Sequence, residues 1–350
     1  MSTIAVNNIT DANDGNTTVI NGITPNAYNT VGKNLVINGA MQIAQRGTSS
    51  NSTGYTTVDR WTSFLSNSTL SVTVSQSTDA PDGFSNSFKW ETTAGATLNT
   101  NTILGVQQWV EAQTLQQLGY GTTSAKKLTL SFWVKSSVTG TFAVSFYEDD
   151  DSRMIGSTYT INTANTWEKK NITIDGDTIG VIDNDNGAGL KPIFHIASGS
   201  DFTSTDNTSW GAYSGGKWAY GHVTNTLATS TGTWQLTGVQ LEVGESATEF
   251  EHRPYTTELL LCQRYYQRVG GNGNSGEALW SSYGASYNYS SWKFAVTMRA
   301  TPTIGGTYSG SVFVGPEFAS AYTTGSNYAA WGWNNSGGGT YSQATADAEL

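Results

Sequence analysis

The sequence predicts an all-β protein: a jelly-roll β-sandwich, then a short helix, then a smaller C-terminal β-rich domain. Three observations support this fold class. Short runs of alternating apolar and polar residues recur along the chain, separated by Gly, Asn and Asp, which is typical of strands and turns. Thr, Ser, Asn and 39 Gly dominate the composition, whereas long amphipathic helical patterns are almost absent. Finally, 350 residues suit one large β domain plus a smaller one.

Residues 1–33 are predicted to form an extended N-terminal arm. They are rich in Asn, Thr and Gly, and their few Ile and Val residues cannot make a core of their own. The short β-prone pieces "TIAVNNIT" and "TTVINGIT" indicate a segment that pairs with another surface. A plain solvated terminus is the alternative interpretation.

Residues 34–252 carry the strands of the predicted sandwich. "NLVINGAMQIAQRG" indicates two strands around an Asn-Gly turn, and "TLSVTVSQS" alternates cleanly. We expect "KKLTLSFWVKSS" and "VTGTFAVSFYEDDD" to be neighbouring antiparallel strands, with the apolar residues from Leu128 to Val134 on one face. "TWEKKNITI" and "PIFHIAS" continue the series, and segment 104–121 indicates a strand that leads into a short helical turn.

The last strand of the sandwich is predicted in "GTWQLTGVQLEVG". Its apolar residues change their alternation at Thr237-Gly238. An extra residue at Gly238, a β-bulge, accounts for this shift.

Residues 253–270 predict a connecting helix. Pro254 marks a break before it, Thr256 suits the N-cap, and Glu258 lies in the first turn, where the helix dipole favours a negative charge. One stripe of this helix is apolar and consists of Leu259, Cys262 and Tyr266. The helix therefore packs either on its own sandwich or against copies of itself.

Residues 271–350 predict the smaller β-rich domain. "YNYSSWKFAVTM", "TPTI", "TYSGSVFVG" and "NYAAWGWNN" have the pattern of short strands, and "ATADAEL" suits a terminal strand. The first of these places four apolar residues on one face, namely Trp292, Phe294, Val296 and Met298. Few large aliphatic residues are present, so we expect a thin core that gains from contacts between subunits.

Charge and composition argue against several classes of partner. The net charge of −10 opposes binding to nucleic acid or to an anionic membrane face. No apolar run approaches the roughly 20 residues that span a bilayer, so we expect no membrane insertion. The start of the chain lacks a secretory signal pattern, and the single cysteine allows no intrachain disulfide. We expect a protein made in the cytoplasm that acts elsewhere only by a route other than secretion.

Six stretches occur in order along nearly the whole chain: "KNLVINGAMQIAQRGTS", "YTTVDRW", "LTLSFWVKSSVTGTFAVSF", "WQLTGVQLEVGESATEFEHRPYTTELLLCQRYYQR", "FAVTMRATPTI" and "ADAEL". This combination resembles tail-fibre-like virion proteins of bacteriophages, including marine and cyanobacterial phages. The resemblance implies a homotrimeric appendage, attached to the phage tail or another virion protein through residues 1–33. It also implies a central jelly-roll like that of carbohydrate-binding modules, and it supplies no catalytic motif.

The expected function is adhesion: a virion protein that binds host cell-surface glycan as its receptor. The alternative is a purely architectural virion protein, an adapter or decoration fibre, whose aromatic residues serve subunit packing.

Two aromatic stretches are candidates for binding glycan, because sugar rings stack on flat aromatic faces. One is "TSWGAYSGGKWAYGH", with Trp210, Tyr213, Trp218 and Tyr220. The other is "SAYTTGSNYAAWGWNNSGGG", with Tyr322, Tyr328, Trp331, Trp333, Asn334 and Asn335. The alternative for both is that these aromatic residues fill cores or subunit contacts.

Acidic loops raise the question of calcium. Glu148 to Asp151 and Asp175 to Asp185 supply several carboxylates, but an EF-hand counted from Asp175 would need Glu where Asn186 stands. Turns capped by Asp side chains explain these loops better. We expect no metal or cofactor, with a structural calcium ion as the minor alternative.

An enzyme is the rival class. A glycan hydrolase needs two opposed carboxylates, and Glu242, Glu249 and Glu251 are close in sequence. We interpret the last two as ion pairs at the exit of the sandwich. His195 lies within a strand, and Cys262 lies on the apolar stripe of the helix. The sequence therefore predicts no catalytic residues.

Overall fold

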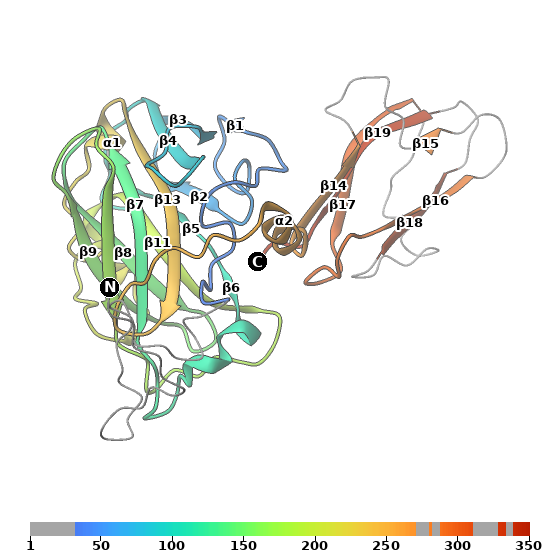
Figure 1. Cartoon of the computed structure of the whole chain (residues 1–350). Coiled ribbons are helices and arrows are strands. Elements are labelled where there is room, and N and C mark those ends of the chain that lie inside the picture. The colour runs from blue at the N-terminus through green and yellow to red at the C-terminus, as the bar shows by residue number, and fades with distance from the viewer. Residues whose placement is uncertain (1–31, 271–279, 282–287, 311–327, 334–338) are drawn as a thin grey trace, which may run out of the picture.

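The computed structural model describes residues 32–350 apart from 271–279, 282–287, 311–327 and 334–338 (Figure 1). The predicted arm, residues 1–33, falls almost entirely outside the described residues. The described chain is mostly β: a sandwich of two antiparallel sheets, a small helix and a C-terminal group of strands. This is the fold class that the sequence predicts.

One layer of the sandwich is a six-stranded antiparallel sheet. Across the sheet, its strands are β1 (Ser49–Ser50), β3 (Ser71–Ser77), β4 (Ser87–Ala94), β13 (Gly232–Val243), β7 (Leu128–Ser136) and β10 (Glu168–Ile174). The last strand in sequence, β13, therefore lies in the middle of the sheet, between β4 and β7.

The other layer is a seven-stranded sheet. Across it lie β12 (Gly211–Ala212), β9 (Arg153–Ile161), β8 (Gly140–Glu148), β11 (Ala188–Ser198), β5 (Ile103–Gln107) and β2 (Thr62–Ser66), and β6 (Val110–Glu111) also pairs with β11. Short helical turns join these strands: η1 (Ala112–Leu118), η2 (Ser200–Phe202), η3 (Gly215–Lys217) and α1 (Thr226–Thr229). The strand β5 followed by η1 confirms the predicted strand and helical turn in segment 104–121.

Large aromatic side chains fill the space between the layers. Trp61, Trp90 and Trp234 are fully buried. The ring of Phe194, from the seven-stranded sheet, lies 5.0 Å from Phe132 and 6.1 Å from Trp234 of the opposite sheet, centroid to centroid. Burial of one such side chain contributes about 1.5–3 kcal/mol, so these contacts between layers hold the sandwich together.

The expected pairing of β7 with β8 is wrong, because the two strands lie in different layers. The apolar face of β7 is buried as predicted, from Leu128 to Val134. It faces β8 across the core: Phe132 of β7 and Phe142 of β8 both pack on the ring of Tyr159. Both strands need an apolar partner, and each finds it in the opposite sheet.

The β-bulge predicted at Gly238 is confirmed. The register of β13 with β7 shifts between Thr237 and Gln240, and Gly238 has a φ of 59°. A left-handed residue at this point favours glycine.

The hairpin expected in residues 34–46 is wrong, since this segment forms turns and bends with no strand. Asn38 has a φ of 57°, and its amide donates to the carbonyl oxygens of Ile43 and Asp59, each at 2.9 Å. The side chain of Asn38 thus satisfies backbone groups that a partner strand would otherwise satisfy.

The connecting helix is shorter than the predicted residues 253–270. Helix α2 spans Tyr255–Gln263, and residues Tyr266–Gly270 form strand β14 instead. Strand β14 pairs with β19 (Gly339–Asp347). Tertiary pairing with a distant segment overrides the local helical pattern here.

Sheet pairing also organises the described part of the C-terminal unit. Strands β14, β15 (Trp280–Ser281) and β17 (Thr303–Gly310) pair with β19, while β16 (Asn288–Lys293) pairs with β18 (Tyr328–Trp333). The strand expected to run on to Met298 ends at Lys293. A small buried cluster forms a core that consists of Phe294, Met298, Ala344, Ala346 and Ala348.

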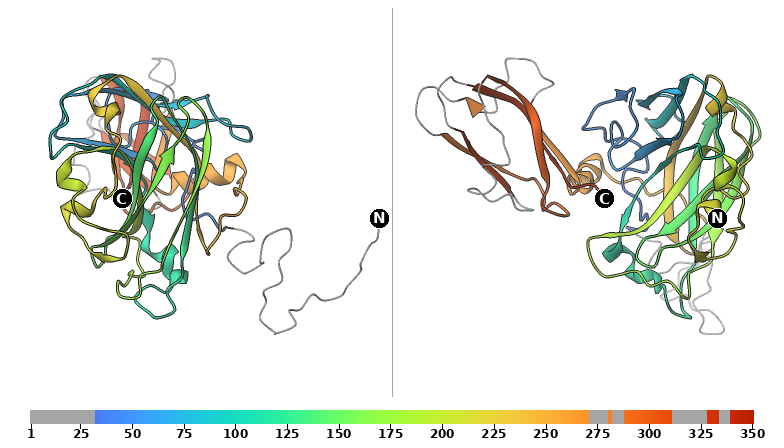
Figure 2. Two further views of the ribbon diagram at one scale, coloured as in Figure 1. Left: turned by 90° about the vertical axis from the view of Figure 1, so that its left-hand side faces the viewer. Right: turned by 180° about the vertical axis from the view of Figure 1, so that it is seen from behind.

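Arg60 joins the sandwich to the C-terminal unit. Its side chain is fully buried and donates to the Glu349 carboxylate and, at 2.6 Å, to the carbonyl oxygen of Trp109. Its guanidinium carbon lies 3.3 Å from the ring centroid of Tyr265. Seen from behind, α2 and the end of the chain lie between the two bodies (Figure 2).

Two more arginines strengthen this junction. Arg46 binds Asp347 at 2.9 Å and Glu349 at 3.2 Å. Arg264 holds both carboxylate oxygens of Glu111, at 2.7 and 2.8 Å. Two-point contacts of this kind fix orientation as well as distance.

Breaking the buried pair should destabilise the protein strongly. Glu349→Gln leaves the Arg60 charge buried with a neutral partner, which costs about 3–5 kcal/mol. Urea unfolding followed by tryptophan fluorescence measures the loss. Glu91→Gln is the matched control, because the Lys89–Glu91 pair is partly exposed and such pairs contribute at most about 1 kcal/mol. Equal effects of the two substitutions would contradict this role of Glu349.

Candidate functional site

The connection that follows β11 covers part of the outer face of the seven-stranded sheet. The backbone N–H of Gly156 in β9 donates to the carbonyl oxygen of Asn207 at 2.8 Å. A Cβ at Gly156 would lie 2.2 Å from the Asn207 amide, so only glycine permits this approach. Because the connection lies on the sheet, Ser145 and His195 are fully buried although they are on the face away from the core.

Two buried histidines hold this connection to the sheet: His195 lies on β11, and His222 lies in the connection itself. His195 Nε2 is 2.9 Å from the Ser145 hydroxyl oxygen. His222 accepts from the Ala143 N–H at Nδ1 and lies 2.8 Å from the Thr224 carbonyl oxygen at Nε2. Burial lowers the pKa of His195 to about 3 and that of His222 to about 4. Both rings are therefore neutral at physiological pH.

Four aromatic residues and one lysine form a cluster that includes part of this connection. They are Trp109, Tyr147, Tyr213 and Trp218, with Lys191 next to all of these rings except Tyr213, and we call this group the aromatic platform. Lys191 and Tyr147 lie directly opposite each other on β11 and β8. The Nζ of Lys191 is 4.2 Å from the ring centroid of Trp109, 5.1 Å from Tyr147 and 5.2 Å from Trp218.

The rings of the platform also contact one another. The centroid distances are 5.6 Å for Tyr147–Tyr213, 5.8 Å for Tyr147–Trp218 and 5.6 Å for Tyr213–Trp218. Tyr213 is 42% exposed, and Trp109, Tyr147 and Trp218 are half-buried. The platform therefore presents aromatic surface to solvent in an arrangement that its own packing holds in place.

Lys191 is the charged centre of the platform. It is 9% exposed, and no hydrogen bond or ion pair joins its ammonium to another of the described residues. Burial lowers the pKa of Lys191 to about 8, and the nearby charge of Asp149 partly offsets this effect. Most of its charge remains at neutral pH.

The structure places only some of the aromatic residues of the first predicted stretch in the platform. Tyr213 and Trp218 belong to the platform. Trp210 does not: its ring packs edge-on against Tyr120 at 5.7 Å, and its Nε1 donates to the Asp175 carbonyl oxygen at 2.7 Å. These contacts hold the connection on the sandwich.

The second predicted stretch is described only in its backbone. Tyr328, Trp331 and Trp333 lie on β18, where Trp331 pairs with Ser290 of β16. Tyr322, Asn334 and Asn335 lie outside the described residues.

Sequence reasoning missed three members of the platform, Trp109, Tyr147 and Lys191. A signal for two of them was present. In β8 the alternation puts Phe146 in the core and Tyr147 on the outer face, and Lys191 is a charge within the apolar run "LKPIFHIA". Sequence alone could not reveal that β8 and β11 are neighbours.

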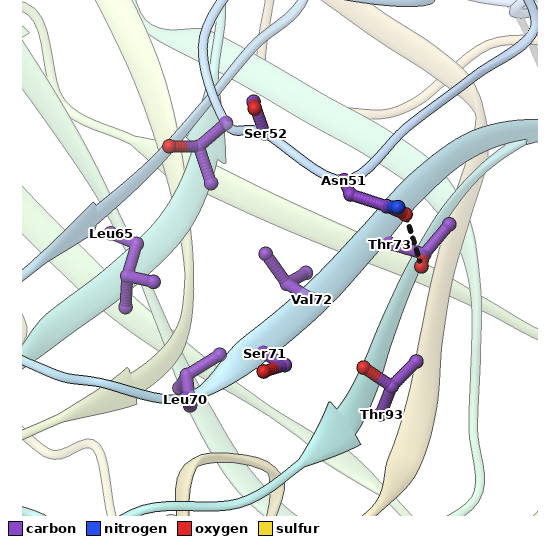
Figure 3. A pocket seen from close by; sticks show the side chains of 9 residues that line it. Asn51, Ser52, Leu65, Leu70, Ser71, Val72, Thr73 and Thr93 are labelled. Carbon is purple, nitrogen blue, oxygen red and sulfur yellow. Dashed lines mark hydrogen bonds between the residues drawn. The ribbon is translucent and has the colours of Figure 1, made fainter.

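A groove lies elsewhere on the sandwich, at the edge of the six-stranded sheet (Figure 3). It has a volume of about 720 Å3 and is lined by Asn51, Ser52, Thr53, Leu65, Leu70, Ser71, Val72, Thr73 and Thr93. The Thr73 hydroxyl donates to the Asn51 amide oxygen at 3.0 Å. This lining offers hydroxyl groups but no aromatic or charged side chain, so it is the weaker candidate site.

The acidic loops bind their own backbone. The Asp183 N–H donates to Asp150 at 3.0 Å, the Val181 N–H to Asp151 at 2.8 Å, and the Gly187 N–H to Asp185 at 2.7 Å. Within the described part of the chain, no group of three or more His, Cys, Asp or Glu could hold a metal ion.

Two of the three carboxylates considered for hydrolysis serve the local structure. The ion pair expected for the third, Glu249, is not formed among the described residues, and this residue is exposed. Glu242 is buried and accepts from Gln240 and Thr248. Glu251 pairs with Arg253 at 3.3 Å and accepts from the Asn34 N–H at 2.9 Å, as expected at the exit of the sandwich. These bonds bind together the start and the end of the sandwich.

Cys262 lies in the interior of the protein. Cys262 is fully buried, and burial raises its pKa well above the usual value, so the thiol is unreactive. Among the described residues, no helix has the length and apolar character that crossing a membrane requires.

Comparisons with known proteins give the following results. No family model matches the chain, and no curated protein matches it. Solved structures share a partial likeness at low identity. The enzymatically active domain of bacteriophage CBA120 tailspike protein 4 has a TM-score of 0.33 and 15% identity, and the match covers 60% of this chain but only 21% of that one.

Sugar-binding proteins are also among these structural matches. The family 11 carbohydrate-binding module of Clostridium thermocellum Lic26A-Cel5E has a TM-score of 0.30 and 15% identity, covering 57% of this chain and 98% of that one. A putative sugar-binding protein from Bacteroides thetaiotaomicron has a TM-score of 0.32 and 11% identity, covering 61% and 100%. These values are too low to carry an argument about ligand or activity.

Because the two histidines are buried in the neutral form, we predict that the free energy of unfolding falls at acidic pH. Because folding lowers the pKa of His222 to about 4, the unfolded chain takes up the proton first. The stability from the neutral ring is therefore fully present above about pH 6.5 and is lost as the pH falls toward 4. His222→Asn keeps an acceptor for Ala143 but cannot be protonated. Between pH 7 and 4 it should lose less stability than the unaltered protein, by an amount on the order of 2–3 kcal/mol.

Urea unfolding at pH 7, 5.5 and 4.5 measures this difference. His252→Asn is the control, since His252 is exposed. Parallel pH profiles for the unaltered protein and His222→Asn would contradict the prediction.

Proposed function

We propose that this protein binds glycans through the aromatic platform. The observation that supports this most strongly is the cluster of four interacting rings, Trp109, Tyr147, Tyr213 and Trp218, that is open to solvent on one face of a rigid sheet. Sugar rings expose C–H groups that stack on such faces. The ring contacts hold the platform in place before binding, which lowers the entropic cost of association.

We propose binding without catalysis. Glu242 and Glu251 are engaged in hydrogen bonds and an ion pair within the sandwich. Neither carboxylate is free to act as the acid or nucleophile that glycoside hydrolysis needs.

The biological role that we propose is host adhesion by a phage virion appendage. The support is the resemblance of the chain, in six ordered stretches, to tail-fibre-like proteins. In this proposal residues 1–33 attach the protein to the tail or another virion protein, and the platform binds host surface polysaccharide. Many weak sites on one particle would give useful avidity.

Removal of two rings of the platform should weaken glycan binding. Tyr213→Ala combined with Trp218→Ala should weaken binding at least about tenfold, because aromatic anchors carry most of the binding energy at such surfaces. A glycan array identifies a ligand, and calorimetry measures its Kd with each variant.

Trp167→Ala is the matched control, because Trp167 is half-buried and precedes β10 in the opposite sheet. The combined Trp331→Ala and Trp333→Ala variant tests the second aromatic stretch. If that variant loses binding while the platform variant keeps it, β18 carries the site. If the unaltered protein binds no glycan, the architectural alternative is favoured.

We propose a homotrimer as the working form. Support comes from apolar side chains on the outside of α2: Tyr255 is 59% exposed and Leu260 is 41% exposed. We expect Leu260→Glu to lower the mass measured by light scattering from that of a trimer to that of a monomer. Ile179→Glu, at a position that is 69% exposed on the sandwich, is the control. A monomeric unaltered protein would contradict this proposal.

A further inference from the structure

We infer that the aromatic platform selects acidic glycans, with Lys191 pairing with an anionic group of the sugar, carboxylate or sulfate. This inference rests on the proposed glycan binding and adds a class of ligand to it. Its origin is the position of one charged side chain at the centre of an otherwise apolar surface.

The rings around Lys191 attract its charge but leave its donors unused. An ammonium group carries three N–H donors, and the faces of Trp109, Tyr147 and Trp218 offer no strong acceptor. Nζ of Lys191 has no hydrogen-bond partner among the described residues. It is nevertheless not one of the fully buried atoms without a partner, so part of it is in contact with solvent. A ligand that lies on the rings can therefore reach it.

The neighbouring charges leave this ammonium available. Asp149 is exposed and forms no ion pair with Lys191 within the described chain. Lys217, the other nearby cation, donates to the Ala212 carbonyl oxygen at 3.0 Å, and His195 is neutral. An anion at Lys191 would thus meet a positive charge that the exposed carboxylate of Asp149 offsets only in part.

Partial desolvation strengthens such a pair. Lys191 is 9% exposed, so its charge has already lost most of its water, and a charge-assisted hydrogen bond is correspondingly strong. The net charge of −10 does not prevent contact, because salt screens charges beyond about 8 Å at physiological ionic strength. A neutral sugar could offer only hydroxyl groups at this point.

The test compares matched ligands on the full chain. The probes are oligogalacturonate against its methyl ester, and a sulfated galactan oligosaccharide against the unsulfated one. We expect the unaltered protein to bind the acidic member of at least one pair about tenfold more tightly. The pair that shows this preference distinguishes carboxylate from sulfate.

Variants at Lys191 give the second readout. Lys191→Gln should bring the ratio of the two Kd values close to one, and Lys191→Arg should restore a preference for the acidic ligand. Lys169→Gln removes the same charge from an exposed position on the opposite sheet and should leave the ratio as it is. Thermal unfolding confirms that each variant is folded.

The two proposals fail in different ways. Platform-dependent binding with equal affinity for both members of each pair overturns the acidic selectivity and leaves glycan binding standing. A ratio that Lys191→Gln does not change overturns the role of Lys191. Absence of binding to these probes and to every glycan on an array overturns both proposals.

Discussion

The buried contact between Arg60 and Glu349 connects the parts of this molecule that lie far apart in sequence. A guanidinium without solvent is costly unless its donors are used. Here the two terminal nitrogens donate to the end of the chain and to the Trp109 carbonyl oxygen, while Nε has no hydrogen-bond partner among the described residues. One side chain thus fixes both the C-terminal unit and the residue that forms one wall of the aromatic platform.

The same constraint holds one of the three platform residues that lie in connections, while Tyr147 and Lys191 lie on strands. Trp109 lies between two strands, and Tyr213 and Trp218 lie in the connection that covers the outer face of the sheet. Each is held by a hydrogen bond of its backbone. Arg60 donates to the Trp109 carbonyl oxygen, the Tyr213 N–H donates to the Ser152 carbonyl oxygen at 2.8 Å, and the Trp218 N–H donates to the Gly215 carbonyl oxygen at 3.1 Å. Two buried neutral histidines, His195 on the sheet and His222 in the connection, complete this support.

Local sequence patterns predicted where strands and turns occur better than they predicted which strands pair with each other. Alternation was enough for strands such as β7, β8 and β13, and the break at Gly238 was enough for the bulge, because both depend on residues near in sequence. It failed at residues 34–46, where the Asn38 side chain binds the backbone in place of a partner strand. The layers of β7 and β8 could not be predicted, since either sheet would bury their apolar faces. Helix α2 ends early because residues 266–270 pair as a strand with β19, a segment about 75 positions away in the sequence. For the same reason only Tyr213 and Trp218 of the platform were predicted. The other members come close to them only through the pairing of strands that are distant in sequence.

The central position of β13 has a consequence for how the chain is made. Residues 232–243 are the last of the sandwich to leave the ribosome, yet β4 and β7 both need them as a partner. Until then two strands have unpaired edges, which can pair wrongly with other chains. Closure between such distant segments is also slow. We therefore expect the six-stranded sheet to close only after its final strand has been synthesised.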